Sequence, residues 1–247
     1  MLMKFFLIYF FILSVSLFSQ TELSSDKLVE KYFKDQSFPD KENYLIDEMS
    51  GQTSTTSIGE ELAGSANVSY YSIQSTEEGA VYNINIKKEG SSANFYCYLV
   101  NENGWKISAI RKFILPSYIY SALDSLSGLK NPGPQDESLL RTLQLITSDD
   151  QNLKNHLKEN LPGYTKLIQY YKSSEKEKAD QLMHKLGSQG IFEDKNYPGC
   201  VFIPIGSIGS SETGYFFTRG ESQPIISPND FIYIEKVAEG WYVYKLM

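Results

Sequence analysis

Residues 94–112 read NFYCYLV-NENG-WKISAIRK, and this stretch decides the predicted fold. In its first piece Phe95, Cys97 and Leu99 share one face, which is the period-2 pattern of a β-strand. The connection ends in an Asn-Gly pair, which tight hairpin turns favour because both residues tolerate positive φ. We therefore predict an antiparallel hairpin whose second strand begins at Trp105.

Strand-like patterns gather in two blocks of the chain. The first block is expected to hold strands over residues 68–73, 80–86, 94–100 and 105–112, and the second over 200–205, 214–219, 230–237 and 241–246. Both blocks consist of short segments separated by turn residues, which is typical of antiparallel sheets.

Helical stripes lie before and between these blocks. Apolar spacing predicts helices over residues 26–34, 119–129 and 139–146, then one carrying Leu153 and Leu157, and one ending near Leu186. Capping-box spacing places the starts of the last two at Ser148 and Ser174. Residues 50–66, rich in Ser, Thr and Gly, are expected to form a loop or a weakly ordered stretch, and the Pro/Gly cluster at 131–134 is the predicted linker.

The two blocks resemble each other. Phe95 precedes Trp105 by the same ten positions that separate Phe231 from Trp241, and both tryptophans follow a Gly. Two hairpins can share such turns by chance. With helices ahead of each block, we favour a tandem duplication.

A helix-then-meander unit that ends in Gly-Trp-x-[Ile/Val] resembles the nuclear transport factor 2-like group, with cystatin-like folds as near relatives. The resemblance implies an α+β fold of two units, each with N-terminal helices packed on a curved antiparallel sheet of about four strands. We expect the units at 21–130 and 131–247. Only one clear helix precedes the first block, so the second unit is expected to supply its missing layer. The fold hosts enzymes, ligand binders and assembly modules, and does not fix the function.

The first residues indicate export. Lys4 precedes a run of apolar and hydroxyl residues over 5–18, which is nearer the length of a signal-peptide core than of a membrane span. We predict a signal peptide at 1–20 and a periplasmic or extracellular protein, with an uncleaved anchor as the alternative. Beyond this segment no membrane span is expected.

Charge and cysteine content limit the choice of partners. The formal net charge is −7, and the basic residues are scattered among acids, which argues against nucleic-acid binding. Two cysteines are few for a scaffold held by disulfides. Cys97, in mid-strand, is expected to be a small buried hydrophobe, while a bridge to Cys200 stays an alternative.

No catalytic, metal or cofactor site is predicted. His156 and His184 lie in separate predicted helices without a partner at ligand spacing, and each is expected to face solvent. The Gly/Ser run at 206–211 has the spacing of neither a nucleophile elbow nor a phosphate loop. Glu235 interrupts an apolar strand and is the one carboxylate with a setting suited to an altered environment.

Aromatic abundance in the strands is the remaining functional signal. Tyr combines an apolar body with a polar tip, which suits a binding surface. The predicted binding residues are Tyr96, Tyr98, Trp105, Tyr233, Glu235 and Trp241. The leading hypothesis is an exported, non-enzymatic module that binds a small apolar ligand or an envelope protein. The alternatives are an enzyme of the same fold with a carboxylate base and a purely structural envelope protein.

Overall fold

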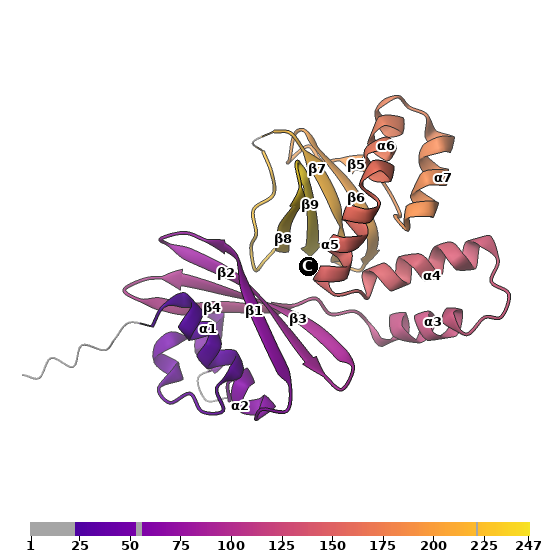
Figure 1. Ribbon diagram of the computed structural model, residues 1–247. Coiled ribbons are helices and arrows are strands. Elements are labelled where there is room, and N and C mark those ends of the chain that lie inside the picture. The colour runs from indigo at the N-terminus through magenta and orange to yellow at the C-terminus, as the bar shows by residue number, and fades with distance from the viewer. Residues whose placement is uncertain (1–22, 53–55, 221) are drawn as a thin grey trace, which may run out of the picture.

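The computed structural model of the protein describes residues 23–52, 56–220 and 222–247. Within these residues the chain forms two antiparallel sheets, with helices before the first sheet and between the two (Figure 1). The mixed α+β class predicted from the sequence is confirmed. The segment predicted as a signal peptide, 1–20, lies outside the described residues.

The first sheet is a meander in which each strand pairs with its neighbour in the chain. Its strands are β1 (Asn67–Ser75), β2 (Gly79–Lys88), β3 (Ser91–Asn101) and β4 (Trp105–Lys112). All four predicted strands are present. The β3–β4 turn has positive φ at Asn103 and Gly104, as the Asn-Gly pair predicted, and brings Asn101 opposite Trp105.

One face of the first sheet packs on helix α1 (Ser25–Lys34). Leu28, Val29 and Phe33 of this helix have no exposed surface, and they share a core with Ile84 and Cys97 from the sheet. The buried position expected for Cys97 is confirmed. Burial of such side chains, at roughly 1.5–3 kcal/mol each, is the main stabilisation of this layer.

Two 3₁₀ helices and a short α-helix complete this side. The 3₁₀ helices η1 (Lys41–Tyr44) and η2 (Asp47–Gln52) lie beside β4, where Ile46 N–H donates to the carbonyl of Ile107. Helix α2 (Ile58–Leu62) falls inside 50–66, so the prediction of a loop there was wrong in part. Ser57 and Glu60 form a capping box, a local signal that the Ser/Thr/Gly-rich composition concealed.

Five helices connect the first sheet to the second. They are α3 (Ser117–Ser127), α4 (Pro134–Ile146), α5 (Asp150–Glu159), α6 (Leu161–Lys172) and α7 (Lys176–Leu186). The Pro/Gly cluster at 131–134 joins α3 to α4, and these two helices pack on each other through Ile119 and Leu143. Figure 1 shows this helical hairpin projecting away from the sheets.

Sequence reasoning missed α6 and misplaced two helix starts. Helix α6 begins with Leu-Pro-Gly, which resembles a break, although Pro is well tolerated in the first turn. Helix α5 is capped by Asp149, which accepts the N–H of Asn152, and not by Ser148. Helix α7 begins after Glu175 rather than Ser174.

The second sheet has five strands in the order β5-β6-β7-β9-β8. They are β5 (Phe192–Glu193), β6 (Cys200–Ile208), β7 (Ser211–Thr218), β8 (Phe231–Ala238) and β9 (Trp241–Leu246). Strand β9, which begins at Trp241, lies between β7 and β8. Strand β4, which begins at Trp105, is an edge strand of its sheet. The Gly-Trp hairpins thus occupy unequal positions, and strand order does not support the duplication inferred from them.

The second half of the chain covers the other face of the first sheet. Val81, Tyr96 and Tyr98 from that face share a buried core with side chains of α5, α6 and the second sheet. The packing layer that we expected the second half of the chain to place on the first sheet is therefore present.

No helix among the described residues combines the length and the apolar character needed to cross a bilayer.

The Glu60 carboxylate makes a testable contribution to the fold. It accepts the N–H groups of Ser57 and Phe38 and pairs with Lys41, and these donors, led by Ser57, hold the pKa of Glu60 at about 2. A lowered pKa stabilises the folded state above the usual carboxyl pKa, and this stabilisation is lost as the pH falls from about 4.5 to about 2. We expect Glu60→Gln to lower the free energy of unfolding by about 1 kcal/mol at pH 7 and by much less near pH 2.

Urea unfolding at the two pH values measures this difference. The matched control is Glu61→Gln, which changes an exposed neighbouring carboxylate. An equal loss of stability at pH 7 and near pH 2 for Glu60→Gln would contradict the assigned role.

Candidate functional site

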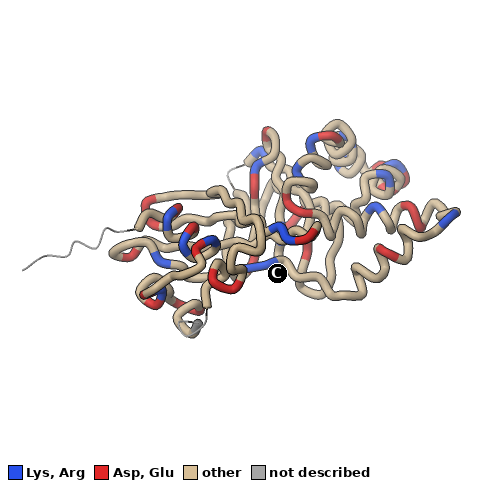
Figure 2. Tube along the Cα trace, turned by 60° about the horizontal axis from the view of Figure 1, so that its bottom comes forward, with Lys and Arg blue, Asp and Glu red and all other residues tan. Residues whose placement is uncertain are grey.

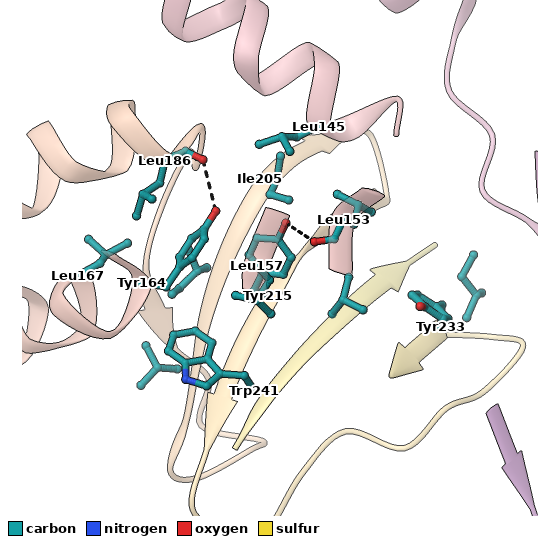
Figure 3. Close-up of a cluster of buried hydrophobic side chains, with 14 of the residues drawn as sticks. Leu145, Leu153, Leu157, Tyr164, Leu167, Leu186, Ile205, Tyr215, Tyr233 and Trp241 are labelled. Atoms are coloured by element: carbon teal, nitrogen blue, oxygen red, sulfur yellow. Dashed lines mark hydrogen bonds between the residues drawn. The ribbon is translucent and has the colours of Figure 1, made fainter. Parts of the chain in front are cut away.

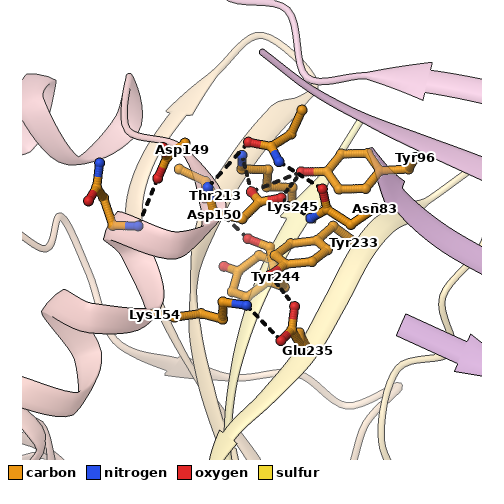
Figure 4. A network of polar contacts seen from close by, with 12 residues as sticks. Asn83, Tyr96, Asp149, Asp150, Lys154, Thr213, Tyr233, Glu235, Tyr244 and Lys245 are labelled. Atoms are coloured by element: carbon orange, nitrogen blue, oxygen red, sulfur yellow. Dashed lines mark hydrogen bonds and ion pairs between the residues drawn. The ribbon is translucent and has the colours of Figure 1, made fainter. Parts of the chain in front are cut away.

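Four of the six predicted binding residues meet where the two sheets face each other, and Figure 4 shows three of them, Tyr96, Tyr233 and Glu235. The rings of Tyr96 and Tyr233 stack with centroids 5.1 Å apart. Tyr98 donates its hydroxyl to the carbonyl of Ile232, 2.6 Å away, and Tyr233 donates to Glu235 over 2.8 Å. We call this region, where the far face of the first sheet contacts α5 and the second sheet, the seam.

Asp150 is the centre of the seam. It is the first residue of α5, where the helix dipole favours a carboxylate. Its Oδ1 lies 2.6 Å from Lys245 Nζ, and its Oδ2 accepts from Asn83 Nδ2 at 2.6 Å, while the Tyr96 hydroxyl lies 3.0 Å from both oxygens. Asp150 is 1% exposed and Lys245 is 3% exposed, so this is a buried ion pair with hydrogen bonds from both sheets.

Glu235 forms a second ion pair beside the first. Lys154 of α5 lies 2.7 Å from one carboxylate oxygen, and the hydroxyls of Tyr71 and Tyr233 donate to the other. Burial raises the pKa of Tyr71, and the hydrogen bond to Glu235 raises it further, so the phenol keeps its proton and remains a donor.

The bonding at Glu235 and Asp150 defines what these carboxylates can do. A general base needs an oxygen within hydrogen-bond reach of a substrate proton. Both oxygens of each carboxylate already accept from protein donors that come from three separate elements. The arrangement fixes the two sheets and α5 relative to one another, which is a structural task.

Trp241 lies in a different part of the second sheet. Trp241 is the first residue of β9 and lies opposite Phe217 of β7, with the two ring centroids 5.1 Å apart. Tyr164 of α6 packs against Trp241 (Figure 3). The preceding Gly240 has φ +70°, and a Cβ there would come within 2.6 Å of the Thr218 carbonyl. The tight turn therefore requires glycine, which accounts for the Gly-Trp pair.

A cavity of about 380 Å³ lies over Trp241, between α6 and the end of β7. Trp241, Phe217 and Ile168 supply its apolar surface. Its other described lining residues are Thr165, Gln169, Lys172, Gly199 and Arg219. The volume lies in the range of small-molecule sites, and an apolar surface with a few polar groups is their usual composition.

The charged side chains at this cavity carry one sign. Elsewhere basic and acidic residues are interspersed along the chain (Figure 2). Among the described residues that line the cavity, the charged ones are Lys172 and Arg219. The Arg219 guanidinium lies over the Phe217 ring, 5.5 Å from its centroid, which is cation–π geometry.

Trp105 lies far from this cavity. It packs, partly buried, against the core between the first sheet and α1. The structure thus distributes the predicted binding residues over three places: four in the seam, Trp105 in the first core, and Trp241 at the cavity.

A wider groove of about 830 Å³ separates α4 from α7 and contains the exposed His184. The Nδ1 atom of His184 lies 3.4 Å from Ser138 Oγ, which is longer than the 2.6–3.2 Å expected of a nucleophile and its base.

His156 was expected to face solvent but is half-buried and stacks on Tyr215, and burial lowers its pKa. No group of three or more His, Cys, Asp or Glu residues in the described chain is arranged to hold a metal.

Sequence reasoning missed Asp150, Lys245, Asn83 and the rim of the cavity. A signal for Lys245 was present in the sequence. Because side chains alternate along a strand, Lys245 lies on the same face as Trp241 and Val243, and this places a charged side chain on a buried face. Asn83 is likewise a polar residue within an apolar strand. Lys172 and Arg219 are distant in the sequence, and no local pattern connects them.

Comparison of the chain with models of protein families, with curated proteins and with solved structures finds no match. The resemblance to the nuclear transport factor 2-like group therefore stays a prediction. It rests on the order of helices and strands and on the Gly-Trp hairpins.

The buried pair at the seam should dominate the effect of mutation there. Lys245→Met leaves Asp150 as an uncompensated buried charge, and we expect the free energy of unfolding to fall by about 3–5 kcal/mol. The double variant Asp150→Asn, Lys245→Met contains neither charge and should be more stable than Lys245→Met alone. Guanidinium unfolding followed by circular dichroism measures both.

An exposed ion pair provides the control. Lys178 pairs with Glu175 at the surface, where water and salt screen the charges, so Lys178→Met should leave the free energy of unfolding nearly unchanged. If Lys245→Met were as mild as Lys178→Met, or if the double variant were less stable than Lys245→Met, the structural role of the pair would be refuted.

Proposed function

We propose that this chain is an exported, non-enzymatic binding module that takes a small apolar ligand in the cavity over Trp241. The observation that carries the proposal is the pair of aromatic rings, Trp241 and Phe217, lining a cavity of about 380 Å³ beside Ile168. Aromatic side chains combine a large apolar contact area with few rotatable bonds, so they lose little conformational entropy when a ligand binds.

Export and domain organisation belong to the same proposal. The signal-like segment at 1–20 would deliver a protein of two α+β units, 21–130 and 131–247, to the periplasm or the cell exterior. The core that α1 forms with one face of the first sheet supports the first unit, whereas the core on the other face of that sheet is shared with α5, α6 and the second sheet and joins the two proposed units. Membership of the nuclear transport factor 2-like group is part of the same hypothesis.

The enzymatic alternative depends on Glu235. This carboxylate is ion-paired with Lys154 and accepts two tyrosine hydroxyls, which leaves its lone pairs directed at the protein. That environment favours a structural role, and the binding proposal needs no reactive group.

Binding of an envelope protein is the second candidate function. Large apolar side chains are exposed on and beside the α3–α4 hairpin: Ile114, Tyr118, Tyr120, Leu129 and Leu139. Exposed apolar patches often mark protein-binding surfaces. A partner captured by the wild type and lost with Tyr118→Ser, Tyr120→Ser would support this function, and equal capture by both would exclude the hairpin as its site.

Filling the cavity should abolish binding of an apolar ligand. Thr165 is an exposed residue of α6 that lines the cavity, so Thr165→Phe can place a ring in it without disturbing the core. We expect native mass spectrometry and fluorescence titration of the mature protein with 4-phenylbutyrate to show binding, and Thr165→Phe to weaken it more than about tenfold, or 1.4 kcal/mol.

Thr165→Ala is the matched control, because it removes the same hydroxyl but leaves the cavity open. Binding should persist in this variant, and all three proteins should unfold at similar temperatures. If Thr165→Phe bound the probe as tightly as Thr165→Ala, the cavity over Trp241 would not be the binding site.

A further inference from the structure

We infer that the ligand of the cavity over Trp241 is an amphipathic anion, a small molecule with an apolar body and one carboxylate. The inference rests on the proposed function and narrows it to a class of ligand. It follows from the distribution of charge and aromatic surface around the cavity.

The rim of the cavity is cationic in an acidic protein. The whole chain has a formal net charge of −7, yet no Asp or Glu is among the described residues that line this cavity. Lys172 ends α6, and Arg219 directly follows β7, so two separate elements that line the cavity each contribute one positive charge. Such a local potential attracts an anion and repels a cation.

The two cations have complementary recognition properties. The Arg219 guanidinium lies over the Phe217 ring, and its planar fork of donors matches the geometry of a carboxylate. Lys172 acts as a flexible point charge that can follow the anion.

The apolar and polar parts of the cavity fit one molecule. Trp241, Phe217 and Ile168 would cover its body, while Lys172 and Arg219 at the exposed rim would pair with its carboxylate. Gln169 and Thr165 add neutral hydrogen-bonding groups to the lining. A neutral apolar molecule would leave both cations without a counterpart, and a fully polar anion would leave the aromatic surface uncovered.

The exposure of Lys172 and Arg219 limits how strongly the cavity should prefer a carboxylate over a neutral amide. Both cations are exposed, and exposed ion pairs contribute less than about 1 kcal/mol each because water and salt screen them. Together they should favour a carboxylate over its neutral amide by about tenfold, and removal of either should reduce affinity about threefold.

The two tryptophans allow a direct measurement. The sequence has only Trp105 and Trp241, and Trp105 lies in the separate first core, so Trp105→Phe makes Trp241 the single fluorescent indole. We expect 4-phenylbutyrate to change the emission of this variant and to bind about tenfold more tightly than the isosteric 4-phenylbutyramide. The preference should shrink at 1 M salt.

Charge variants in the same background locate the anion. Lys172→Met and Arg219→Met should each weaken binding of the carboxylate about threefold and leave the amide unchanged. Lys166→Met is the control, because Lys166 lies on the same helix but outside the cavity, over Tyr170. That variant should bind both probes as before.

The outcomes separate this inference from the proposed function. Equal affinity for the carboxylate and the amide, or a preference that survives in the double variant Lys172→Met, Arg219→Met, would overturn the anion inference and leave an apolar site in place. If neither 4-phenylbutyrate nor 4-phenylbutyramide changed the emission of Trp241, and if neither released or absorbed heat in a calorimetric titration, both the inference and the proposed function would fail.

Discussion

The ion pair between Asp150 and Lys245 is the interaction on which the arrangement of the two sheets depends. An isolated charge in this position would lose several kcal/mol of hydration, so the pair is stable only when Asn83 and Tyr96 complete its hydrogen bonds. These four residues come from α5, the first sheet and the second sheet. The requirement that all of them meet fixes a single relative placement of the three elements, which apolar packing alone specifies less sharply.

The closed seam accounts for the location of the cavity in which we propose that a ligand binds. Tyr96, Tyr98 and Tyr233 occupy the contact between the sheets, and their hydroxyls are bonded within it. The second sheet extends beyond this contact to the β8–β9 turn, where Trp241 and Phe217 meet α6. A rigid seam would thus support a cavity at the outer end of the second sheet. The preorganisation that a small binding site needs is provided by the packing behind it.

Much of the fold followed from local patterns, and most of the site did not. The Asn-Gly turn and the alternation around Cys97 predicted the β3–β4 hairpin, because both features act over a few residues. Helix α6 was missed because its Leu-Pro-Gly start resembles a break. Trp241 was selected from a strand pattern; like Tyr96 and Tyr233 it is a buried core residue, but unlike them it also lines a cavity. Asp150 meets its partners, and Lys172 and Arg219 come to line one cavity, only when distant segments fold together, which no periodicity reveals.

We infer that the seam makes the two sheets one cooperative structure. Native-state hydrogen exchange tests it by measuring the opening free energies of strand amides in β2 and β3 and in β7 and β9 of the same molecule. We expect the most protected amides of both sheets to exchange through one global opening, with the same free energy and the same dependence on denaturant. Exchange of one sheet at a free energy several kcal/mol below the other would show that the sheets open independently, and would contradict the claim.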